Sequence, residues 1–422
     1  MKKRVEKVKG LFLVMLVASM FMVIATPEEA KAVPSFARQQ EQACTLCHWA
    51  FPKLNESGAD YKFRGYRFKA EEGKDVWALD TWPISFVGEI EALYNDDTAK
   101  NGAVSRKQDV KIEEVEFILA TPIGKKWSTF GEAAVEYDSA SDSYEIGIAT
   151  LFLTYHFYDD GKLNIRVRQF PIEFTYLTEK MREIIHNRPL AADPAVLGFF
   201  KTQKGIEING QLLAPKGSKM PTYRYYLGLV RGEAEATSSE RGLRNPSWYG
   251  TFEVNWLGQN LGLHYRQGRE DRGSEGDVDT KYLTVNTELN YKYNPVGDFK
   301  LLLAYWQKEE QDWGGAGQLD VKYPTYTANL YYKPEFMKEL ILGARYDTLK
   351  VESDDASIDG MHRTAKVLSA TYFFTPNIYF GFEVRDLDSG VTGIGTAYPS
   401  TISSSSTSWN QSRYRAFLVA AF

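Results

Sequence analysis

The chain has 422 residues, 14% of them aromatic, and a formal net charge of -5. This length suits two domains or one large barrel. The acidic balance argues against nucleic acid as a partner, because nucleic-acid-binding domains carry a basic patch. Past the first 30 residues no long apolar run occurs, so we expect no membrane-spanning helix in the mature chain.

The first 32 residues have the pattern of a secretory signal peptide. Met1 to Lys9 is basic, Leu11 to Ala25 is apolar, and Ala30-Lys31-Ala32 matches an A-x-A cleavage site. A membrane anchor is the alternative, but the apolar stretch is short for a spanning helix. Cleavage after Ala32 would remove six Lys/Arg and three Asp/Glu, so the net charge would fall from -5 to -8.

Residues 33–81 contain the run Cys44-Thr45-Leu46-Cys47-His48. A C-x-x-C-H run is an attachment site for a c-type haem, in which both sulfurs bond to the porphyrin and the histidine ligates iron. The chain has no other cysteine, so these residues lack the further ligands of a zinc site. We expect one covalent haem c on Cys44 and Cys47 with His48 as axial ligand; the alternatives are a chance match to the pattern and a structural disulfide.

A segment as short as residues 33–81 is marginal for independent folding. We therefore expect the haem, or the wall of a larger domain, to complete its core. The apolar residues available to pack on a porphyrin are Pro34, Phe36, Phe51, Pro52, Leu54, Tyr61, Phe63, Tyr66 and Phe68.

Several short runs flank the C-x-x-C-H pattern. They are Pro34 to Gln39, Phe51 to Leu54, Gly58, and Tyr61 to Tyr66. Together they resemble the head of the fused cytochrome–porins, in which one c-haem segment precedes an outer-membrane barrel and whose known members are iron(II) oxidases. The chain departs from the family pattern at Gln40, Glu41, Asn55, Ser57 and Ala59.

This resemblance implies oxidation of extracellular Fe(II) by outer-sphere electron transfer, so that the chain would be an iron(II) oxidase. The haem would pass the electron to a periplasmic cytochrome or another periplasmic carrier. Two alternatives stay open: a transport porin whose haem is structural or senses redox state, and electron transfer with a different donor or direction.

From Trp82 onward apolar and polar residues alternate, as in Trp127 to Tyr137 and Leu283 to Tyr293. Alternation with aromatic residues near the segment ends is typical of transmembrane β-strands. About sixteen segments show it: 83–94, 108–121, 127–137, 145–157, 162–170, 204–213, 222–232, 247–256, 260–269, 280–293, 298–308, 323–332, 339–351, 364–374, 377–388 and 411–422.

The connections between these segments alternate between short and long, which distinguishes an outer-membrane barrel from a soluble β-sandwich. The last segment ends at Phe422 and is similar to the assembly signal of outer-membrane barrels. We therefore predict an all-β fold: an antiparallel outer-membrane barrel of about sixteen strands, residues 82–422, embedded in outer-membrane lipid.

An unfilled barrel of this size encloses an aqueous lumen. We expect residues 33–81 to plug it from the periplasmic side; a cytochrome hanging below an open porin is the alternative. Polar residues expected to face the lumen are Glu89, Glu91, Glu132, Glu136, Arg166, Arg168, Glu207, Glu253, His264 and Arg266.

The long connection 171–203 is expected to fold into the pore, where Met181 or His186 is a candidate distal haem ligand. A methionine ligand would raise the haem potential relative to a second histidine. Acidic pairs such as Asp96-Asp97, Glu270-Asp271 and Glu309-Glu310 are expected in outer loops. There they would attract Fe²⁺ or form an ordinary solvated face.

Overall fold

The computed structural model describes residues 35, 37, 42–68, 83–99, 104–138, 143–172, 174, 184–193, 197–199, 202–215, 217–231, 246–271, 277–313, 319–354, 359–389 and 409–422. The predicted signal peptide, residues 1–32, lies outside these residues. The candidate ligand Met181, and Pro34 and Phe36 of the predicted haem segment, also lie outside them.

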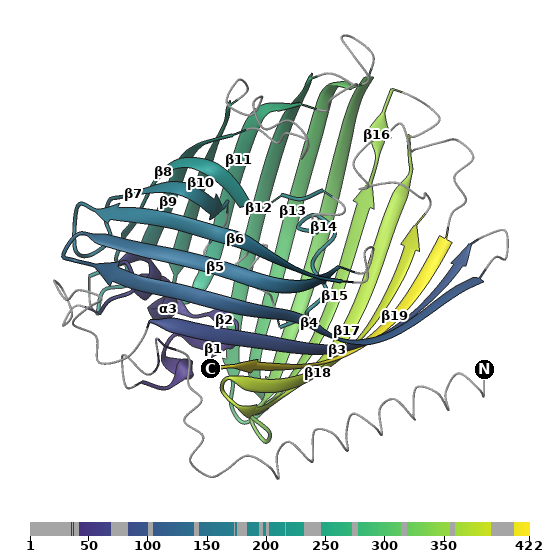
Figure 1. Cartoon of the computed structure of the whole chain (residues 1–422), viewed down its shortest axis with the longest axis horizontal. Helices are drawn as coiled ribbons and strands as arrows, with labels where there is room; N and C mark the ends of the chain where they lie inside the picture. The colour runs from purple at the N-terminus through teal and green to yellow at the C-terminus, as the bar shows by residue number, and fades with distance from the viewer. Residues whose placement is uncertain are drawn as a thin grey trace.

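Strands β3 to β19 form one closed antiparallel barrel, in which β19 pairs with β3 (Figure 1). Only Val351 separates β15 from the two-residue β16, so the two count as one strand and the barrel has sixteen. The predicted all-β barrel is therefore confirmed. The elements are β3 (Ile84–Ala99), β4 (Val104–Ile123), β5 (Trp127–Asp138), β6 (Ser143–His156), β7 (Asn164–Pro171), β8 (Thr202–Leu212), β9 (Thr222–Arg231), β10 (Pro246–Trp256), β11 (Gln259–Asp271), β12 (Asp277–Tyr293), β13 (Gly297–Trp313), β14 (Leu319–Pro334), β15 (Leu340–Lys350), β16 (Glu352–Ser353), β17 (His362–Thr375), β18 (Ile378–Ser389) and β19 (Trp409–Ala421).

The strands run further toward the long connections than the sequence pattern predicts. Strand β4 begins at Val104 rather than at residue 108, and β13 ends at Trp313 rather than at residue 308. Pairing continues because backbone hydrogen bonds between strands do not require an apolar face. The acidic pairs Asp96-Asp97, Glu270-Asp271 and Glu309-Glu310 consequently lie in strands, and their assignment to loops is wrong.

The outer surface of the barrel is apolar. Along β9 the exposed fraction is 57% for Leu227 but 1% for Tyr226, so successive side chains point to opposite faces. Exposed Trp127 and Trp256 lie beside the short turns, where barrels carry an aromatic girdle. A closed barrel with this surface leaves no strand edge unpaired in lipid. Among the described residues, no helix has the length and apolar character needed to cross a membrane.

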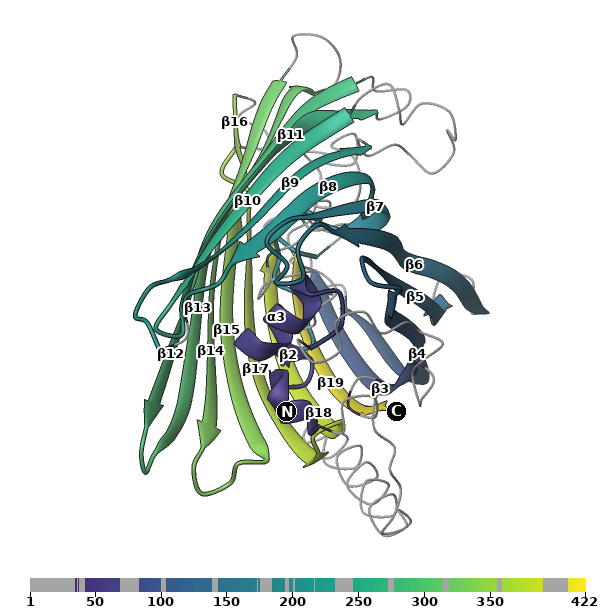
Figure 2. The same ribbon diagram turned by 90° about the vertical axis from the view of Figure 1, so that its left-hand side faces the viewer.

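Two segments fill part of the lumen. The first, residues 42–68, contains η1 (Cys44–Leu46), β1 (His48–Ala50), β2 (Lys53–Leu54) and α3 (Glu56–Phe63), drawn in purple inside the barrel opening in Figure 2. Lys53 forms an ion pair with Glu288 of β12 at 2.7 Å, and Glu56 forms one with Arg224 of β9 at 2.5 Å. The described part of the predicted plug therefore lies inside the barrel, against its wall.

The second segment is the connection between β7 and β8. The Phe199 ring packs on Tyr282 and Trp306 of the inner wall, with centroid distances of 5.0 and 5.3 Å. Phe174 and Leu190 are buried in the same cluster. The expectation that this connection folds into the pore is confirmed for its described residues.

Most of the predicted lumen-facing residues are buried. Arg166 lies 3.5 Å from Glu207, and the His264 ring shares a 2.7 Å hydrogen bond with Thr251. Glu136 and Arg168 are exposed instead. The buried ones are Glu89, Glu91, Glu132, Arg166, Glu207, Glu253, His264 and Arg266.

Candidate functional site

The C-x-x-C-H residues form a compact turn. The Cys47 amide donates to the Cys44 carbonyl at 3.2 Å within η1. His48 opens β1 and pairs with Leu54 of β2 in a two-stranded hairpin. Local backbone bonding thus holds both sulfurs and the imidazole together.

Asn55 ties this turn to helix α3. Its side-chain oxygen accepts the Gly58 amide at 3.0 Å, which caps the helix, and its NH₂ group donates to the Leu46 carbonyl at 3.0 Å. Asn and Thr both serve as N-caps, so the departure from the family pattern at Asn55 keeps this role. A Cβ on Gly58 would lie 2.2 Å from the Cys47 oxygen. Only glycine allows α3 to approach the motif this closely.

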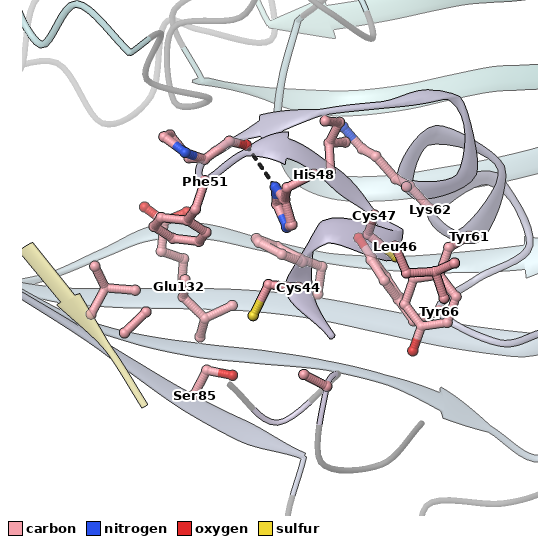
Figure 3. Close-up of a pocket in the computed structure, with 18 of the residues that line it drawn as sticks. Cys44, Leu46, Cys47, His48, Phe51, Tyr61, Lys62, Tyr66, Ser85 and Glu132 are labelled. Atoms are coloured by element: carbon pink, nitrogen blue, oxygen red, sulfur yellow. Dashed lines mark hydrogen bonds between the residues drawn. The ribbon is translucent and has the colours of Figure 1, made fainter. Parts of the chain in front are cut away.

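The orientation of the His48 ring suits an axial ligand. Nδ1 lies 3.1 Å from the Pro52 carbonyl oxygen (Figure 3). A carbonyl only accepts, so Nδ1 must carry the proton and Nε2 is left with a lone pair for iron. Burial lowers the pKa of His48 to about 4. The imidazole is therefore neutral at pH 7, as metal ligation requires.

Cys44 and Cys47 are free thiols in this structure. Burial raises the pKa of Cys44, and it raises that of Cys47 to about 11, with a smaller contribution from the neighbouring Cys44. The structural-disulfide alternative is not realised here.

The motif faces a cavity of about 260 Å³ between the N-terminal segment and the barrel wall. Strands β3 to β6 supply one side, and Figure 3 shows Cys44 directed toward it. Lys62, also in the lining, carries the charge opposite to a haem propionate. The apolar residues that line the cavity include Phe51, Tyr61, Tyr66, Phe68, Val87, Ile118, Phe130 and Phe152. Two thiols, a neutral imidazole and aromatic walls fit a covalently attached porphyrin.

Six of the apolar residues predicted to pack on a porphyrin line the cavity, Pro52 and Leu54 among them. Phe51, Tyr61, Tyr66 and Phe68 line the cavity, whereas Phe63 packs on Tyr226 at 5.6 Å instead. The strand residues Val87, Ile118, Phe130 and Phe152 also line the cavity, although the sequence pattern does not single them out. The alternating pattern indicates on which face of its strand each residue lies. It does not indicate which strands lie opposite the motif, because that depends on how the barrel closes.

The structure does not bring His186 to this cavity. Its Nε2 lies 2.7 Å from Oε1 of Glu89, and neither residue belongs to the cavity lining. Within the described residues, His48 is the only histidine or methionine in that lining. With Met181 outside the described residues, the distal ligand stays a prediction.

The barrel is similar in fold to solved outer-membrane channels. The outer membrane channel DcaP of Acinetobacter baumannii matches with a TM-score of 0.56 and 12% identity, over 80% of this chain and 97% of that chain. An anion-selective porin from Comamonas acidovorans matches with a TM-score of 0.54 and 10% identity, over 80% of this chain and 99% of that one.

OmpF of Salmonella typhi, solved in complex with daunomycin, matches with a TM-score of 0.52 and 12% identity, over 84% of this chain and 99% of that one. The chain matches no protein-family model and no curated protein. At these identities the likeness concerns the fold alone, which is that of a porin-type outer-membrane β-barrel.

Proposed function

We propose that this chain is an outer-membrane electron-transfer protein of the fused cytochrome–porin type. Cys44 and Cys47 hold one haem c covalently and His48 ligates its iron. An electron passes from extracellular Fe(II) to a periplasmic cytochrome or another soluble carrier. The N-terminal segment enters from the periplasmic side, at the barrel end that carries the short turns.

One observation carries this proposal: the C-x-x-C-H turn lies inside the barrel with His48 oriented by Pro52 and a largely apolar cavity beside it. A haem bound there would supply one-electron redox chemistry. A free-standing cytochrome would not need a binding wall built from barrel strands. Here Phe130 and Phe152, from β5 and β6, complete the cavity.

Contacts with the barrel wall hold the site in place. Arg67 donates to the Lys125 and Trp127 carbonyls of the β4–β5 hairpin at 2.6 and 2.7 Å. Trp49 packs on Tyr331 of β14 with a centroid distance of 6.2 Å. Contacts with distant parts of the wall fix the segment, and a fixed site needs little reorganisation during electron transfer.

The test is anaerobic addition of Fe²⁺ to purified, oxidised holoprotein while the haem absorption bands are followed. Rapid reduction at neutral pH is expected. If ascorbate reduces the haem and Fe²⁺ does not, the iron assignment is wrong and only a haem-bearing barrel remains.

A transport porin is the second candidate, and the fold similarity to channels supports it. Single-channel conductance in a planar bilayer separates the two. The plug predicts low conductance that rises when residues 33–81 are deleted. A high, steady conductance of the intact protein would favour transport.

A further inference from the structure

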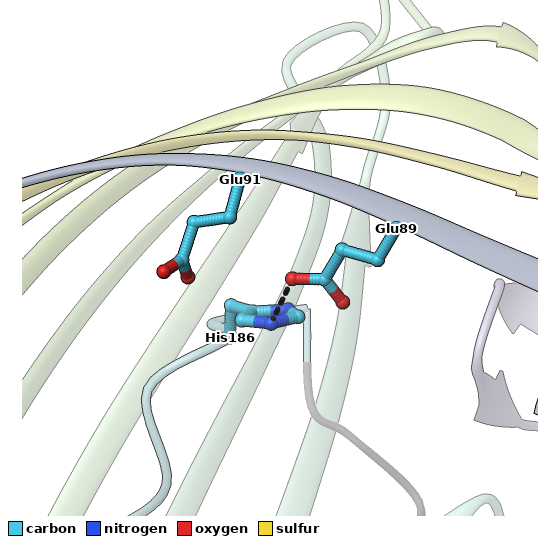
Figure 4. A group of neighbouring side chains, drawn as sticks. All are labelled: Glu89, Glu91 and His186. Atoms are coloured by element: carbon cyan, nitrogen blue, oxygen red, sulfur yellow. Dashed lines mark ion pairs between the residues drawn. The ribbon is translucent and has the colours of Figure 1, made fainter. Parts of the chain in front are cut away.

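A second group of side chains lies in the lumen, outside the cavity of the motif. Glu89 and Glu91 of β3 meet His186 of the β7–β8 connection, and their potential ligand atoms all lie within 4.8 Å of one another. Figure 4 shows both carboxylates extending from β3 toward the imidazole. Within the described residues, no other group of three His, Cys, Asp or Glu side chains has this spacing.

The fold holds these three side chains together from two directions. Glu89 and Glu91 are two positions apart on one strand, so both point inward, and each is 1% exposed. His186 stacks on Phe417 of β19 with a centroid distance of 4.6 Å. The imidazole is therefore oriented by packing as well as by its contact with Glu89.

The backbone around His186 is fixed to the wall. The His186 and Asn187 amides both donate to the carboxylate of Glu383 in β18. Arg345 of β15 donates to the Asn187 carbonyl and, at 2.9 Å, to the Arg188 carbonyl. Such anchoring is typical of a built site, in which supporting contacts orient the ligands.

The spacing and donor types suit a metal ion. An ion with bonds of about 2.1 Å keeps adjacent ligands roughly 3 Å apart, and Nε2 of His186 lies 2.7 Å from Oε1 of Glu89. Two carboxylates and one imidazole are donors for Mn²⁺, Fe²⁺ or Zn²⁺. Arg415 lies 2.5 Å from Oε2 of Glu91, so a bound ion would share this carboxylate with the guanidinium or displace it.

We propose that Glu89, Glu91 and His186 bind a divalent first-row transition-metal ion in the lumen. Building on the proposed function, this ion is the substrate Fe²⁺, held where it gives up its electron. Fe²⁺ then becomes Fe³⁺ and the ferric haem iron becomes ferrous. One electron moves, and no bond or proton needs to be exchanged.

The position of the group relative to the motif supports this role. Ser85 and Val87, the preceding inward positions of β3, line the motif cavity. A series of aromatic contacts also connects the group to the motif. It runs from His186 through Phe417, Tyr379 and Phe51 to His48, with centroid distances of 4.6, 6.3, 6.3 and 5.4 Å. Packed side chains therefore join the ion-binding group to the axial histidine.

The test uses Mn²⁺, which binds similar ligands but does not reduce haem. Binding to detergent-purified, oxidised holoprotein is measured from the loss of the six-line electron paramagnetic resonance signal of free Mn²⁺. Glu89→Gln and His186→Gln should each weaken the tightest site about tenfold or more. Glu310→Gln, at a lumen carboxylate paired with Lys308, is the matched control and should leave this site intact.

Equal Mn²⁺ binding by the wild type, Glu89→Gln and His186→Gln would overturn the proposal and reduce the group to an ion pair. Unchanged haem bands show that the variants are folded. In the Fe²⁺ assay, His186→Gln should raise the Fe²⁺ concentration needed for half-maximal reduction, while reduction by dithionite stays normal. If Mn²⁺ binds as expected but Fe²⁺ does not reduce the wild-type haem, the metal site stands and the proposed function fails.

Discussion

At the residue scale, Asn55 and Gly58 determine how close helix α3 comes to the two thiols. The asparagine joins the helix start to the Cys44–Leu46 turn, and the glycine leaves room for the Cys47 carbonyl. Both lie outside the C-x-x-C-H run. Haem attachment should therefore depend on residues that do not contact iron.

Replacing Gly58 by alanine should impair haem attachment. The new Cβ would lie 2.2 Å from the Cys47 oxygen, and overpacking of this kind costs about 1–3 kcal/mol. The measurement is haem content per barrel in purified protein. Gly147→Ala on β6 is the control, because a Cβ there meets nothing within 4 Å. Full haem loading of Gly58→Ala would contradict the close approach of α3.

Asn55 variants separate its two roles. Asn55→Asp keeps a cap for the Gly58 amide but loses the donation to Leu46, whereas Asn55→Ala loses both. We expect Asn55→Ala to lower stability by about 1–2 kcal/mol, with Asn55→Asp between it and the wild type. Denaturant midpoints read from the haem bands would show the order, and identical midpoints would exclude a structural role for Asn55.

At the element scale, the N-terminal segment is held by charged contacts with the wall. Lys53 and Glu288 form an ion pair in which both side chains are nearly fully buried, and Lys300 also contacts Glu288 at 3.2 Å. Removing the single partner of a buried charge costs about 3–5 kcal/mol, and the loss of Lys53 should cost less because Lys300 still faces Glu288. The docking of the N-terminal segment on the barrel wall should therefore depend on the Lys53–Glu288 pair.

Lys53→Met should loosen the plug and increase opening events in planar-bilayer recordings. The double variant Lys53→Met with Glu288→Gln should behave more like the wild type, because it removes the half-paired carboxylate while Lys300 keeps its hydrogen bond to Asn290. Arg269→Met, which breaks an exposed pair with Asp279, is the control and should have little effect. If the double variant opens as often as Lys53→Met, the ion pair does not hold the plug.

At the scale of the whole molecule, alternation made the barrel predictable from sequence. Each strand carries its own period-two pattern, and loop lengths separate the two barrel ends. The same pattern wrongly assigned Asp96-Asp97 and Glu309-Glu310 to loops, because strand pairing extends beyond the apolar band.

The site was predictable only where its residues are local in sequence. Cys44, Cys47 and His48 lie within one run of five residues, whereas Phe130, Phe152 and Glu288 meet the segment through barrel closure. His186 illustrates this limit: as a loop histidine it is a candidate haem ligand, yet the fold brings it to Glu89. Contacts between such distant residues depend on strand register, which no local pattern encodes.

The proposed function requires that the barrel carries one covalent haem. The most direct measurement is the intact mass and pyridine haemochrome spectrum of protein expressed with a cytochrome c maturation system. We expect the mature polypeptide mass plus one haem, and loss of that addition in the double variant Cys44→Ser with Cys47→Ser. A wild-type mass equal to the polypeptide alone, with both thiols open to alkylation after unfolding, would contradict it.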